Sequence, residues 1–216
     1  MYPQLVEDGR VFISLPPLYR VNNSKDPFVI NKQDYIKRYV KAVSKEFDVG
    51  KKINNKDDID WFDKDKVGEF LYNTANYVND VGVLAEHYKI NERLLDIIFQ
   101  EIAKLNVPDD EVLKNLAVQT LMNTIQEEFP ELYFDDKDHL IKGVIDTKYQ
   151  LLEINNTFIR RCSDAINILK WIDLHHDESI VLRNKKTGTT YNEGLLFILK
   201  MLSRYQPEII HRFKGC

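Results

Sequence analysis

The chain contains few of the residues that define several protein classes. Its 216 residues include 2 cysteines, 8 glycines and 7 prolines. Cys162 and Cys216 are too few for a disulfide framework, and the low glycine and proline content excludes collagen-like, linker-rich and low-complexity chains. We therefore expect one large or two small folded domains in a reducing compartment.

Long apolar runs are also absent from the sequence. No stretch approaches the roughly 20 apolar residues that a membrane helix requires. The first residues, MYPQLVED, have neither the basic nor the apolar region of a signal peptide. The sequence therefore predicts a cytoplasmic protein without a membrane partner.

The charge balance is mildly acidic. There are 34 acidic and 30 basic side chains, which gives a formal net charge of -4 at pH 7. This net charge gives no sign of nucleic-acid binding but leaves it undecided, because a local basic strip can still bind phosphates. No dinucleotide fingerprint, phosphate loop, paired CxxC or HExxH motif is present.

Local patterns predict an α+β fold. Short strands are expected near the N-terminus, at residues 11–15, 18–21 and 28–30. From Asp34, a candidate N-cap, apolar residues at helical spacing extend to Phe47 and predict a helix that Gly50 ends. The polar residues 51–65 predict a surface loop.

Helical spacing dominates the middle of the chain and returns later. It predicts three or four amphipathic helices between Val67 and Ile125 and another helix behind the capping candidates 155–157. A β-hairpin with its turn at Asp146 and Thr147 is expected between these regions. The remaining predicted elements are a strand at 180–182, a turn at 185–188, a helix around 195–202 and a strand at 209–213.

Three groups of side chains are candidates for chemical sites. Cys162 lies on an apolar helical stripe with no histidine at a fixed local spacing, which favours a buried thiol over a nucleophile. His175 and His176 are adjacent and point in different directions, so a metal site there is disfavoured. Five aspartates between residues 57 and 65 lack the glycine and terminal glutamate of an EF-hand, which favours a solvated loop over a calcium site.

Two motifs at opposite ends of the chain carry a family resemblance. The segment LVEDGRVFISLPPLYRV at residues 5–21 resembles the "LIE-G-VYIA-PPLY-V" segment of the gyrase B and topoisomerase IV B-type subunits of type IIA DNA topoisomerases. In that family it follows the magnesium-binding strand of the TOPRIM domain. The segment IHRFKG at residues 210–215 resembles the start of the family's "QRYKGLGEM" motif.

The middle of the chain matches the family more weakly but in the same order. Residues 68–105 resemble a helical insertion in the TOPRIM domain of some gyrase B subunits, and FIRRC at 158–162 resembles its "-EYRRIC" segment. The resemblance implies a partial TOPRIM-type α/β sheet, parallel in its core, built from the two ends of the chain. The implied segments are a C-terminal TOPRIM portion (1–33), an inserted helical and β-hairpin subdomain (34–188), and a returning helix and strand (189–216) truncated at RFKG.

The resemblance also implies that catalysis lies elsewhere. The family's "EGDSA" segment and its Asp-x-Asp strand, which hold magnesium, are not found here, nor is the ATPase domain. The implied function is a split or truncated, bacteriophage-type fragment of an ATP-dependent type II topoisomerase B subunit that contributes scaffold and DNA contacts. Mg²⁺ and ATP belong to the complete enzyme, and the implied partners are DNA, other fragments of the B-type subunit and the A-type subunit.

Four cations are candidates for DNA contact. Arg212 and Lys214 are preferred, and Lys185 and Lys186 are weaker candidates, because cations at a strand end or turn can neutralise phosphates. The alternative for each is a solvated surface cation. A second function also stays open, in which the helices between Val67 and Ile125 form a non-catalytic protein-interaction module.

The absence of the family's acidic segments predicts an inactive isolated chain. We expect the pure protein neither to cleave nor to relax supercoiled DNA with Mg²⁺ and ATP, because no metal would stabilise the charge that develops at the phosphate. Gel electrophoresis of plasmid DNA tests this expectation. Magnesium-dependent cleavage by the pure chain would contradict it.

Overall fold

A computed structural model describes residues 18–20, 28–29, 32–53, 58–135, 140–174 and 178–210. The fold is α+β, as the sequence predicted. The described helices are α2 (Lys32–Val43), α3 (Lys64–Thr74), α4 (Tyr77–Tyr88), α5 (Glu92–Leu105), α6 (Val112–Asn115), α7 (Val118–Glu128), α8 (Asn156–Arg161), α9 (Ser163–Ile172) and α10 (Leu195–Ser203). The described strands are β1 (Leu18–Arg20), β2 (Phe28–Val29), β3 (Phe47–Ile53), β4 (Ile59–Trp61), β5 (Tyr133–Asp135), β6 (Leu140–Ile145), β7 (Lys148–Glu153), β8 (Glu178–Asn184), β9 (Thr190–Tyr191) and β10 (Glu208–Ile210).

The strands form separate sheets of order β10-β1-β2, β4-β3-β8-β9 and β5-β6-β7. In the first sheet, β1 pairs with β10, with Leu18 opposite Ile210. All pairs among the described strands are antiparallel. The parallel core that the resemblance implies is therefore not found among these strands.

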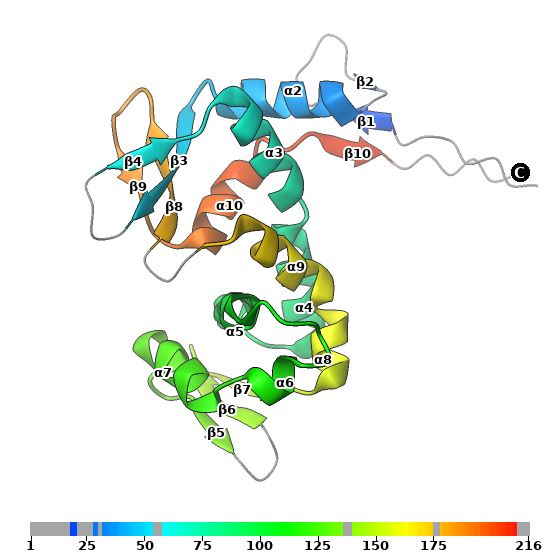
Figure 1. Ribbon diagram of the computed structural model, residues 1–216, viewed down its shortest axis with the longest axis vertical. Coiled ribbons are helices and arrows are strands. Elements are labelled where there is room, and N and C mark those ends of the chain that lie inside the picture. Colours follow the sequence, from blue (N-terminus) through cyan, green and yellow to red (C-terminus); the bar gives the residue numbers. More distant parts are fainter. Residues whose placement is uncertain are drawn as a thin grey trace, which may run out of the picture.

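The elements form an elongated arrangement (Figure 1). The β4-β3-β8-β9 sheet lies at one end with α2, α3 and α10, and the β5-β6-β7 sheet lies at the other end with α6 and α7. Helices α4, α5, α8 and α9 lie between them. None of the helices in the described part of the chain combines the length and apolarity needed to cross a membrane.

Helix α5 is the centre of the core. Residues 94–99 are all buried, and Asn91 caps the helix by accepting hydrogen bonds from the amides of Arg93 and Leu94. The buried run includes one charged residue, Asp96, whose carboxylate accepts hydrogen bonds from Tyr77 Oη (2.7 Å), Arg93 Nη1 (2.5 Å) and Gln100 Nε2 (2.9 Å). Burial raises the pKa of Asp96, although these donors oppose the shift.

The helix predicted from Asp34 to Phe47 is shorter than expected. It begins at Lys32, so Asp34 lies in its first turn, and it ends at Val43, so Phe47 belongs to β3. The predicted loop at 51–65 is also partly wrong, because β3 extends to Ile53 and pairs with β4. Gly50 is therefore a strand residue, where a Cβ would lie 2.8 Å from Trp61 Cε3.

Two other predicted helical runs contain breaks. The chain is extended at Leu116 and Ala117, between α6 and α7, and Cys162 (φ −97°, ψ 2°) separates α8 from α9. The predicted helix over α5, the hairpin of β6 and β7 and the Asn155 cap of α8 are confirmed.

The predicted segment boundaries fall within connected structure. Residues 33 and 34 both lie in α2, and residue 188 lies in the turn between the paired strands β8 and β9. The four-stranded sheet therefore includes residues from both the predicted insertion and the predicted return segment.

Two tyrosines test the importance of the Asp96 contacts. Tyr77→Phe should destabilise the protein by about 2 kcal/mol, because it removes a hydrogen bond from a buried charged group. Tyr39→Phe is the matched control, since Tyr39 Oη donates to the neutral carbonyl of Leu202 (3.0 Å), and it should cost about 1 kcal/mol. Urea unfolding measures both free energies, and an equal or reversed order would contradict the assignment.

Candidate nucleic-acid interface

Helix α2 has two chemically different faces. Tyr35, Tyr39, Val40 and Val43 are buried against the protein. Lys37, Lys41 and Lys45 follow one another at four-residue spacing and are all exposed, with Lys45 just beyond the helix. Because residues four apart lie on the same helical face, these lysines form a row along α2.

Helix α3 packs close beside α2. Gly68 permits the approach, since a Cβ there would lie 3.0 Å from Ile36 Cγ2 and 3.3 Å from Val40 Cγ2. Next to this contact, the two helices border a groove of about 940 Å³. Its lining residues are Lys32, Ile36, Lys37, Val40, Lys41, Ser44, Lys45, Lys64, Asp65, Gly68, Glu69, Tyr72, Asn73 and Lys185.

The lining of this lysine groove is strongly basic. It contains six lysines but only two acidic side chains, Asp65 and Glu69. Lys37, Lys41 and Lys45 form no ion pair with any residue that the structure describes. Their ammonium groups are therefore available to an anionic ligand.

Of the two predicted cations that the structure describes, Lys185 and Lys186, Lys185 lines the groove. Its Nζ donates to the carbonyl of Ser44 (2.7 Å) and lies 3.1 Å from Asp48 Oδ1, while Arg183 Nη2 lies 2.7 Å from Asp48 Oδ2. Burial opposes ionisation of Asp48, but the hydrogen bonds and charges of Arg183 and Lys185 outweigh it and lower the pKa of Asp48. Lys185 thus fixes the β8–β9 turn beside the end of α2 while remaining partly exposed.

The other predicted DNA contacts are not brought to the groove by the described structure. Lys186 is exposed in the same turn, where its backbone amide donates to Asn184 Oδ1 (2.9 Å), but it does not line the groove. Arg212 and Lys214 lie outside the described residues. His175 and His176 also lie outside them.

The described residues do not fit a metal centre. Within the described ranges, no three His, Cys, Asp or Glu side chains gather as ligands would. In the aspartate-rich segment, Asp63 caps α3 through the amide of Lys66 (2.8 Å) and Asp60 pairs with Lys66 Nζ (2.9 Å). Asp57 lies outside the described residues.

Cys162 is a buried thiol, as predicted. Burial raises its pKa to about 12, although Arg161 opposes the shift. A thiol with this pKa is almost entirely protonated at neutral pH and is a poor nucleophile.

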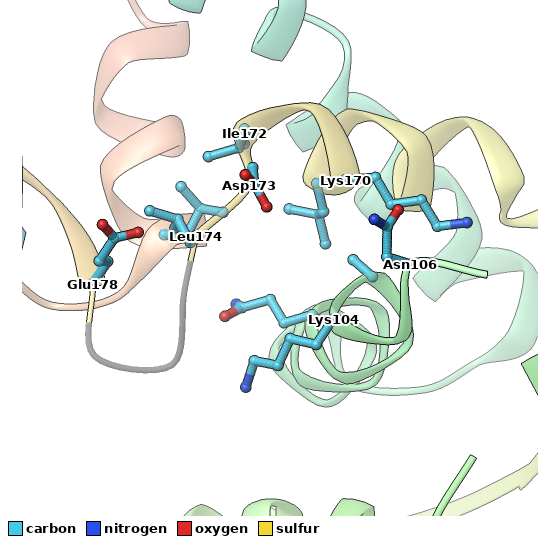
Figure 2. Close-up of a pocket in the computed structure, with 11 residues that line it drawn as sticks. Lys104, Asn106, Lys170, Ile172, Asp173, Leu174 and Glu178 are labelled. Carbon is cyan, nitrogen blue, oxygen red and sulfur yellow. The ribbon is translucent and has the colours of Figure 1, made fainter. Parts of the chain in front are cut away.

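A smaller hollow of about 310 Å³ lies where α5 and α9 end (Figure 2). Its lining includes Asn106 and Asp173, the left-handed caps that end these helices. Nearby cations are already engaged, because Lys170 Nζ donates to the carbonyl of Val107 (2.8 Å) and Lys104 Nζ pairs with Glu101 (2.5 Å). Lysines near helix C-termini offset the partial negative charge of exposed carbonyls, so these cations have a structural role.

The sequence interpretation missed the lysines of α2. The sequence does contain the signal, because lysines spaced four residues apart lie on the polar face of the predicted helix. The position of α3 and Lys185 beside that row was not visible, because it depends on packing between distant segments.

The sequence matches no known protein-family model, and no curated protein shows significant similarity to it. The resemblance to type IIA topoisomerases therefore rests on the motifs quoted above.

The ion pair of Lys185 can be tested by titration. Lys185→Ala should move the pKa of Asp48 up toward its ordinary value, because one of the two cations that favour the carboxylate is lost. Stability gained from a lowered carboxyl pKa is present above the ordinary pKa and lost as pH falls, so the variant should also be less stable at neutral pH. Carboxyl NMR titration measures the shift. Lys186→Ala is the control and should leave Asp48 unchanged; an equal effect of both substitutions would contradict the pairing.

Proposed function

We propose that this chain is a non-catalytic, DNA-binding part of a type IIA topoisomerase B-type subunit. The observation that carries DNA binding is the lysine groove between α2 and α3. The family assignment adds the enzyme context and is supported by the two terminal motifs. In this proposal the chain acts in the cytoplasm of a bacterial or phage-infected cell.

The geometry of the groove suits a phosphate backbone. Lys37 and Lys41 lie about 6 Å apart along the axis of α2 at 1.5 Å per residue, and Lys45 continues the row just beyond the helix. A row of this kind can contact successive phosphates of one strand. Contacts of this kind position nucleic acid without reading its sequence, as expected of a scaffold element.

The pairing of β1 with β10 agrees with the family assignment in bringing the two resembling segments together, although its direction is antiparallel. Strand β1 belongs to the first resembling segment, and β10 ends where the second begins, with Leu18 opposite Ile210. In the proposal, Mg²⁺, ATP hydrolysis and strand cleavage are supplied by other fragments of the B-type subunit and by the A-type subunit. This chain contributes contacts to the DNA phosphate backbone, and its β10-β1-β2 sheet docks on those fragments.

A second candidate function, protein interaction, is favoured by a different surface. On the β5-β6-β7 sheet, Tyr133, Val144, Tyr149 and Leu151 have exposed fractions of 53%, 39%, 60% and 49%. The register places Val144 opposite Tyr149, so these two share one face. The β5-β6-β7 sheet lies at the end of the molecule remote from α2 and α3 (Figure 1), so the two functions are compatible.

Replacing the lysine row should weaken DNA binding in a salt-dependent way. For the triple variant Lys37→Ala, Lys41→Ala and Lys45→Ala, we expect the slope of log K against log salt to fall by about 2.7, since each phosphate contact contributes about 0.9. Fluorescence anisotropy with a labelled duplex at about 50 to 200 mM salt measures the slope.

The matched control removes the same charge elsewhere. Lys114, Lys148 and Arg160 are exposed and do not line the groove. Their triple alanine variant should bind DNA nearly as well as the original chain. Conversely, Asp65→Asn with Glu69→Gln should strengthen binding. Equal losses in both triple variants, or no binding by the original chain, would overturn the proposal.

A further inference from the structure

A hollow of about 520 Å³ lies beside the contact of α9 with the α3–α4 region. On α9, the lining residues are spaced by three and four residues and so share one face of the helix. Asn73, Asn76 and Asp80 line one wall, and Asp164, Asn167 and Trp171 line the other.

Trp171 is the unusual member of this set. Its exposed fraction is 44%, although it lies on α9, whose opposite face is buried in the core. The other tryptophan of the chain, Trp61, lies under the guanidinium of Arg183, with 4.3 Å from Cζ to the ring. Trp171 therefore presents a large aromatic surface to a polar, solvent-accessible hollow.

The hollow adjoins the lysine groove. Asn73, near the end of α3, lines both spaces. The basic and aromatic surfaces are therefore neighbours, with Asn73 shared between them.

We propose that this hollow binds an unpaired nucleobase of a nucleic-acid strand whose phosphates occupy the lysine groove. The inference rests on the proposed nucleic-acid binding and adds which part of the ligand enters the second space. An aromatic ring offers a stacking surface to any base, and side-chain amides and carboxylates can hydrogen-bond the edge of an unpaired base.

The charge of the hollow favours a base over a phosphate. Asp80 and Asp164 would repel a phosphate, whereas their oxygens can accept hydrogen bonds from the amino and imino groups of a base. Burial raises the pKa of Asp80; Asn79 opposes this shift and the charge of Asp164 adds to it. An accessible hollow with one aromatic wall and polar edges suits a flat heterocycle with polar edges.

Trp171 can report its own contact with a base. In a Trp61→Phe background, Trp171 is the remaining tryptophan, because the chain contains only 2. A short single-stranded oligonucleotide should quench its fluorescence at saturation. An abasic strand of the same length should bind through its phosphates without comparable quenching.

Substitution of Trp171 supplies the second measurement. Trp171→Ala should weaken oligonucleotide binding about tenfold, the scale of one lost base–aromatic stack, and leave the abasic strand unaffected. Trp171→Phe should retain most of the affinity. Tyr149→Ala is the control, since Tyr149 is also an exposed aromatic residue but lies on the remote sheet, and it should change neither affinity.

The outcomes separate the two proposals. If neither strand nor the labelled duplex binds, the proposed function itself fails; if only the duplex binds, the base site is wrong. If both strands bind with equal affinity and Trp171 is not quenched, the lysine groove binds nucleic acid but the base site is wrong. Asn167→Ala, an exposed change in the same hollow, should selectively weaken the base-containing strand if Trp171→Ala does not fold; no effect would likewise overturn the base site.

Discussion

The buried carboxylate of Asp96 constrains how the helical layer can assemble. Leaving a buried charge without its partners costs about 3 to 5 kcal/mol, so α5 must be oriented with donors around it. Tyr77 supplies one donor from α4, and Arg93 supplies another while its Nε binds Glu128 of α7 (3.0 Å). These contacts fix the rotation of α5 against both neighbours. The apolar residues on either side of Asp96 then meet the surrounding helices in a single arrangement.

Local sequence patterns predicted elements whose stability is mainly local. The α5 stripe, the β6–β7 hairpin and the Asn155 cap all follow from residues close together in the chain. The error at Phe47 has a non-local cause, because β3 pairs with β8, more than a hundred residues away, and that pairing competes with helical spacing. A pattern within one short window does not contain this information.

The lysine groove demonstrates the same limit for the site. Lys37, Lys41 and Lys45 could be found from spacing alone, whereas Lys64 on α3 and Lys185 in the β8–β9 turn join them only through packing. The acidic net charge of the chain concealed the groove, because bulk charge averages over surfaces of opposite sign. For predicting a binding surface, the distribution of charged side chains over the molecule is therefore more informative here than the net charge.

The antiparallel pairing of β1 with β10 has a consequence for the architecture of a larger protein. Everything from β2 to α10 leaves and returns across one pair of neighbouring strands, whose opposite Cα atoms are about 5 Å apart. A host loop could therefore accept or lose this whole segment without stretching its own ends. The entropy of closing such a long connection grows only with the logarithm of its length. The segment thus has the geometry of a domain insertion.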